Sequence, residues 1–152
     1  MTVTLPGERT LLIDSNVRQP SLHGLLRCAL TPGLADALTA PELWQQSIQR
    51  TTVDNLHVVA AGTVTPTTPA ALESSTFDTL LARYKETYDL ILCAAPPVLG
   101  LTDAAVLGSK VDVTCLVLTS GVSHVDTILE AKDVLEAVQA NVIGAILTNR
   151  NA

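Results

Sequence analysis

Five short, uninterrupted runs of apolar residues are the feature that most constrains the fold of this chain. They cover Thr10–Asp14, Leu56–Ala60, Leu90–Ala94, Val113–Thr119 and Val142–Leu147, and all are rich in Val, Ile and Leu. An apolar run without alternating polar residues is typical of a strand covered on both faces, as in a parallel sheet. We therefore expect five such strands.

Helical patterns lie between some of these runs. Residues 75–87 place an apolar stripe on one face of a helix, with Ser74 or Ser75 as its cap; the stripe consists of Phe77, Leu80, Leu81 and Tyr84. Residues 123–138 carry a second stripe, made of Val125, Ile128, Leu129, Val134, Leu135 and Val138. Strands that alternate with helices predict an α/β fold, a doubly wound and mostly parallel sheet with right-handed crossovers.

Length and composition limit the class of protein. The 152 residues fit a single domain over 1–152. A net charge of −6 argues against nucleic-acid binding, which needs a basic face. The uncharged apolar stretches, Leu90–Thr102 and Val113–Val125, are shorter than the ~20 residues of a membrane span. The sequence shows no signal-peptide pattern, and its three cysteines are an odd number without paired spacing. It therefore predicts a cytoplasmic domain with free thiols.

Several kinds of catalytic site are not indicated by the sequence. It contains no Gly-x-Ser-x-Gly nucleophile motif and no Lys-Ser or Lys-Thr pair, which a phosphate-binding loop requires. His23, His57 and His124 lack metal-ligand spacing, so we expect no metal site. Cys93 and Cys115 lie inside apolar runs, where packing in the core is the favoured interpretation.

Ligands of such sheets bind at the carboxyl ends of the strands. The segments to consider there are 14–20, 95–103, 120–124 and 148–151. Asp14 and Asp103 are the acidic residues of these segments, and a single carboxylate in a loop more often caps a helix or forms a turn. The loop Ser120–Ser123 offers backbone amides to an anion, but capping by Ser123 explains the same residues and is preferred.

The carboxyl-end segments resemble those of a known family. Leu11–Leu25 (LLIDSNVRQPSLHGL) resembles the second Walker segment of the bacterial tyrosine kinases of capsule and exopolysaccharide export, Asp-x-Asp-x-Arg followed by Pro-Ser-Leu-His. Tyr88–Ala104 (YDLILCAAPPVLGLTDA) is similar to their third segment, and Gly33–Thr39 and Leu56–Gly62 resemble two more. Gly144–Arg150 resembles the closing strand, whose Asn-Arg flanks the adenine. The resemblance covers residues 7–152 and implies a P-loop NTPase-like fold.

The sequence also departs from that family. Only nine residues precede Thr10, so we expect the strand and helix of the phosphate loop to be missing. Asn16 stands at the family's second aspartate, and Ala94 at the aspartate that organises Mg²⁺. The family uses ATP and Mg²⁺; we expect neither to be a cofactor here. The resemblance leaves Asp14, Arg18 and Asp103 as remnant catalytic candidates, and Asn149 and Arg150 as remnant adenine-side candidates.

Three functions remain open at this point. The leading hypothesis is a catalytically degenerate module that regulates or scaffolds exopolysaccharide biosynthesis, peripheral to the inner membrane through a partner. That partner is a membrane chain-length regulator (a polysaccharide co-polymerase) or an active kinase of the same system. The first alternative is a fragment or subunit of an active ATP-dependent tyrosine kinase whose phosphate loop lies upstream or on another chain. The second alternative is a generic α/β anion-binding domain.

The amino-terminal residues carry one more prediction. Met1–Leu5 (MTVTL) suits an extended segment, and we expect it to pair with the strand Thr10–Asp14 or a neighbouring one after a turn at Pro6–Gly7. Otherwise an interior strand presents bare amides and invites association with another chain. The sequence therefore predicts either a completed sheet or a homo-oligomer formed through an exposed sheet edge.

Overall fold

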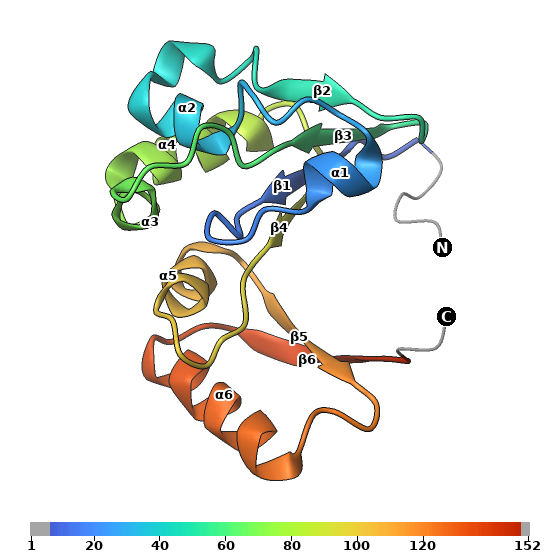
Figure 1. Cartoon of the computed structure of the whole chain (residues 1–152), viewed down its shortest axis with the longest axis vertical. Coiled ribbons are helices and arrows are strands. Elements are labelled where there is room, and N and C mark those ends of the chain that lie inside the picture. Colours follow the sequence, from blue (N-terminus) through green and yellow to red (C-terminus); the bar gives the residue numbers. More distant parts are fainter. Residues whose placement is uncertain (1–6, 150–152) are drawn as a thin grey trace. The chain divides into compact units, whose positions relative to one another are not determined.

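A computed structural model describes residues 7–149 of the chain (Figure 1). In order, its elements are β1 (Thr10–Asp14), α1 (Leu22–Leu26), α2 (Leu34–Thr39), the 3₁₀ turn η1 (Pro41–Leu43), β2 (Ile48–Arg50), β3 (Leu56–Val59), α3 (Thr68–Ala71), α4 (Ser75–Lys85), β4 (Leu90–Ala94), α5 (Asp103–Lys110), β5 (Thr114–Thr119), α6 (Val125–Ala137) and β6 (Val142–Thr148). They fall into two compact units, 1–96 and 97–152. The single domain over 1–152 stays a prediction.

The first unit is built on a four-stranded sheet with the order β2-β3-β1-β4. Strand β1 lies between β3 and β4 and is parallel to both, with Thr10 opposite Leu56 on one side and Leu90 on the other (Figure 1). Leu11 and Ile13 are fully buried in β1. An α/β fold with a mostly parallel sheet is thus confirmed, and β1, β3 and β4 coincide closely with three of the predicted runs.

Strand β2 was not predicted. It pairs antiparallel with β3, with Gln49 opposite Val58, and forms the outer edge of the sheet. Its three residues, Ile48–Arg50, are too short and too polar to produce an apolar run. The Gln49 side chain holds a loop against this edge, because its amide donates to the Ala29 carbonyl and its carbonyl accepts from the Ala29 N–H, both at 2.8 Å.

Helix α2 extends the ladder of β3 by direct backbone contact. The N–H groups of Leu34 and Ala35 donate to the carbonyls of Ala60 and Ala61 at 2.8 and 2.9 Å. This approach requires glycine at position 33, where an added Cβ would lie 2.4 Å from both Ala60 O and Gly62 N. The helix thereby closes over the end of β3 without any side chain between the two backbones.

Helix α4 buries the stripe that the sequence predicted. Phe77 and Tyr84 are fully buried, and Leu80 and Leu81 are nearly so. Ser74 is the residue that precedes the first turn, as expected, but its hydroxyl donates to the Ala71 carbonyl at 2.6 Å instead of capping the helix. The Tyr84 hydroxyl lies 3.3 Å from Ser47 Oγ, which gives this buried phenol a polar partner.

The second unit consists of the parallel pair β5–β6 with helices α5 and α6. Leu135 of α6 is buried at 1% exposure, but Val125 and Leu129 of the predicted stripe are 70% and 53% exposed. Val117 of β5 and Leu147 of β6 are also mostly exposed. The prediction that every apolar run is covered on both faces is therefore wrong for these two strands within the described residues, because α5 and α6 leave side chains such as Val117 and Leu147 uncovered.

Two further expectations concern the ends and the helices of the chain. The predicted pairing of Met1–Leu5 lies outside the described residues, and β1 has a parallel strand on each side, β3 and β4. No helix within residues 7–149 has the length and apolar character that crossing a membrane requires.

Candidate functional site

Asp14 lies at the carboxyl end of β1 and caps the following helix. Its side chain is 1% exposed, and Oδ2 accepts hydrogen bonds from the N–H groups of Ser21 and Leu22, each at 3.0 Å. These two amides begin α1, and the Ser21 side chain makes no capping bond. The first remnant candidate is thus engaged as a helix cap, the role that the sequence favoured for a single loop carboxylate.

The residues after Asp14 form a turn that the side-chain amide of Asn16 stabilises. Asn16 Oδ1 accepts the Gln19 N–H at 3.2 Å, and Arg18 is exposed in the same loop. An asparagine is neutral and offers one weak oxygen ligand where a carboxylate would neutralise a divalent cation. Asp14 and Arg18 therefore share one loop, but the second acidic group of the family's pattern is absent from it.

The end of β4 is apolar and close to the end of β1. The Ser15 N–H donates to the Ala94 carbonyl at 3.0 Å, so the two strand ends are joined by backbone and Ala94 contributes only a methyl side chain. Burial raises the pKa of the neighbouring Cys93 thiol to about 11, and the Ser15 hydroxyl acts against that rise. A thiol held protonated in this way is a poor nucleophile or metal ligand.

The remaining candidates belong to the second unit. Asp103 is 4% exposed and is the first residue of α5, where a negative side chain interacts favourably with the helix dipole. Asn149 directly follows β6 and is exposed. Arg150 lies outside the described residues. Asp14 and Arg18 share one loop of the first unit, Asp103 and Asn149 belong to the second unit, and the roles of all five residues stay predictions.

The loop at the end of β5 is bonded within itself. Ser123 Oγ accepts the Thr119 N–H at 3.0 Å, and the Val122 and Ser123 N–H groups donate to the Thr119 carbonyl. Helix α6 begins two residues later, after His124. The sequence suggested Ser123 as the cap of α6, but the residue before the helix is His124. Ser123 instead stabilises the turn at the end of β5.

These positions can be tested for an Mg²⁺–nucleotide fit. Among residues 7–149, no three His, Cys, Asp or Glu side chains come together as a metal-binding group. Asp14 Oδ2 accepts hydrogen bonds from two backbone N–H groups, Asn16 is neutral, and the Ala94 side chain has no atom that can bind a metal ion. The described donor set therefore does not fit a nucleotide-bound Mg²⁺ ion, and no phosphoryl-transfer step can be derived from it.

Replacing Asp14 tests its capping role. For Asp14→Ala we expect a loss of about 2 kcal/mol in the free energy of unfolding, because two partly buried N–H groups lose their acceptor. Asp14→Asn keeps an oxygen acceptor of the same shape, so about half of that loss is expected. Urea titration followed by the fluorescence of Trp44, the one tryptophan of the chain, measures both. Unchanged stability of Asp14→Ala would contradict the capping role.

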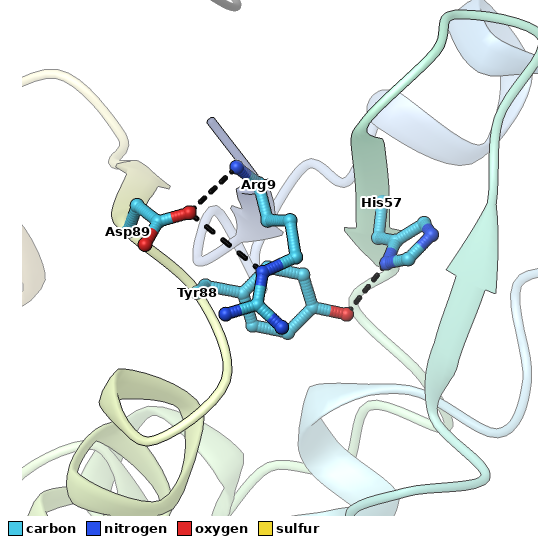
Figure 2. A network of polar contacts seen from close by, with 4 residues as sticks. All are labelled: Arg9, His57, Tyr88 and Asp89. Atoms are coloured by element: carbon cyan, nitrogen blue, oxygen red, sulfur yellow. Dashed lines mark hydrogen bonds and ion pairs between the residues drawn. The ribbon is translucent and has the colours of Figure 1, made fainter. Parts of the chain in front are cut away.

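A polar network at the opposite, amino end of the sheet was not found from the sequence. His57 Nδ1 lies 2.7 Å from the Tyr88 hydroxyl, and the centres of the two rings are 5.6 Å apart, edge to face (Figure 2). The Arg9 N–H donates to Asp89 Oδ2 at 2.8 Å, and Arg9 Nε lies 3.7 Å from the same oxygen (Figure 2). These four residues come from segments up to 80 positions apart, which is why no sequence spacing reveals them.

Burial favours the neutral forms of His57 and Tyr88. Burial, followed by the charge of Arg50, lowers the pKa of His57. Burial raises the pKa of Tyr88, and the nearby Arg9 opposes that rise. Both groups are therefore neutral near pH 7, and the Tyr88 hydroxyl donates a hydrogen bond to His57 Nδ1 when that nitrogen is unprotonated.

The lowered pKa of His57 predicts a pH dependence of stability. In the unfolded chain His57 takes up a proton near its ordinary pKa of about 6.5, whereas the folded state resists that proton to lower pH. The contribution of His57 to the free energy of unfolding should thus be constant above pH 7 and should fall as the pH drops from 6.5 toward the folded-state pKa.

A pair of variants isolates this contribution. His57→Phe should flatten the pH dependence of the melting temperature between pH 5 and 7, apart from the contribution of other groups. Tyr88→Phe should lower stability and reduce the slope only in part, because burial and Arg50 still lower the pKa of His57. Equal slopes in wild type and His57→Phe would refute the assignment.

Comparison with curated proteins reveals a consistent set of relatives, although no protein-family profile matches the chain. The chain is 28% identical over 144 residues to the tyrosine-protein kinase YwqD of Bacillus subtilis, covering 95% of this chain and 61% of that protein. It is 29% identical over 142 residues to CpsD of Streptococcus pneumoniae, covering 93% and 63%. It is 34% identical over 110 residues to the kinase wzc of Salmonella typhi, covering 72% of this chain and 15% of that one.

Comparison with solved structures agrees. The kinase domain of the Escherichia coli tyrosine kinase ETK superimposes with a TM-score of 0.90 at 28% identity, covering 95% of this chain and 56% of that one. The VpsO kinase domain gives a TM-score of 0.90 at 26% identity, covering 96% and 72%. The cell-division ATPase MinD of Pyrococcus furiosus gives 0.75 at 22% identity, which supports the P-loop NTPase-like fold alone.

The extent of these matches is as informative as their identity. The chain spans 61–64% of the length of the first curated relatives it matches. Within that span the similarity runs through both compact units, since 93–97% of the chain is included. In sequence and in fold, the chain is similar to the bacterial tyrosine-protein kinases of capsule and exopolysaccharide systems.

Proposed function

We propose that this chain acts in capsule or exopolysaccharide biosynthesis as a non-catalytic, tyrosine-kinase-like module. Its role is to regulate or scaffold the system by binding the cytoplasmic part of a membrane chain-length regulator or an active kinase of the same system. Such binding would hold it at the inner face of the membrane. The similarity to YwqD, CpsD and wzc supports a role in capsule or exopolysaccharide biosynthesis, since the chain resembles the tyrosine-protein kinases of those systems.

One observation supports the non-catalytic part of the proposal. The carboxyl ends of β1 and β4 are joined by the bond from Ser15 N–H to Ala94 O, but the side chains there are the neutral Asn16 and the apolar Ala94. The remaining carboxylate, Asp14, holds the start of α1. Phosphoryl transfer depends on positioned charge, and loss of one such group typically costs ~10²–10³ in rate. A chain that keeps the scaffold and lacks the charges is suited to binding a partner.

Isothermal titration of the purified chain with ATP and Mg²⁺ tests this proposal. We expect no saturable heat at micromolar to low-millimolar nucleotide, in wild type or in Asn16→Asp/Ala94→Asp, because the described residues offer no phosphate cradle. The ETK kinase domain serves as the positive control for the method. Micromolar, Mg²⁺-dependent binding by the wild-type chain would overturn the non-catalytic role.

A second function is favoured by the lengths of the relatives. The matched part is 61–64% of those proteins, so the chain also suits a part of an ATP-dependent tyrosine kinase whose phosphate loop lies on another segment or chain. Under this alternative, adding a polypeptide with a Gly-Lys-Thr loop to the chain should create ATP binding that neither part shows alone. Absence of binding in the mixture favours the non-catalytic module.

A further inference from the structure

We draw no further inference here: the strongest candidate, the set of exposed apolar side chains on β5, β6 and α6 of the second unit (Val117, Leu147 and Leu129 among them), lies open within residues 7–149 of a chain that spans 61–64% of the length of the first curated relatives it matches, and nothing in the structure shows what covers it.

Discussion

Gly33→Ala should destabilise the first unit by roughly 3 kcal/mol or more, at or above the upper end of the usual overpacking cost. The added methyl would lie 2.4 Å from Ala60 O and from Gly62 N, and both are backbone atoms. They can retreat only if the bonds from Leu34 and Ala35 to the end of β3 lengthen or break. Urea unfolding followed by Trp44 fluorescence measures the loss.

Gly24→Ala is the matched control for this substitution. Gly24 lies inside α1, where a methyl group added to its Cα would meet no heavy atom within 4 Å, and its backbone is helical. Alanine there should be neutral or should stabilise the chain by about 0.5–1 kcal/mol, because it reduces the entropy of the unfolded state. If both variants lose the same stability, the close contact of α2 with β3 is not the cause.

Phe77→Ala should have a similarly large effect, about 3–5 kcal/mol. Phe77 is fully buried and is the largest apolar residue of the α4 stripe, so its loss leaves a cavity in addition to the lost transfer free energy. The same urea titration applies, since Trp44 lies against Tyr84 of α4 with ring centres 6.0 Å apart.

Leu25→Ala provides the comparison at the surface. Leu25 is 77% exposed, so truncating it should change the free energy of unfolding by less than about 0.5 kcal/mol. A Phe77→Ala variant as stable as Leu25→Ala would mean that α4 does not supply the core of the first unit. A loss confined to Phe77→Ala supports the packing of α4 against the sheet.

The sequence alone determined the elements whose signal is local. The apolar runs of β1, β3, β4, β5 and β6 are visible because each is contiguous in the sequence, and the stripe of α4 is visible because its buried residues repeat with the period of a helix. The resemblance in the loop after Asp14 was visible for the same reason, since its residues are contiguous. The α/β class, the parallel sheet and the loop of the candidate site followed from these signals.

Only the tertiary structure decided which backbones and side chains meet. β2 and α2 are short, and contacts between residues about 20–30 positions apart fix their places. Gln49 of β2 bonds to Ala29, and Gly33 before α2 lies against the backbone of Ala60 and Gly62 at the end of β3. The amide partners of Asp14 and the pairing of His57 with Tyr88 likewise depend on how distant segments fold together. An apolar strand has the same sequence whether or not a neighbour covers it, so periodicity reports the need for a partner but not its presence.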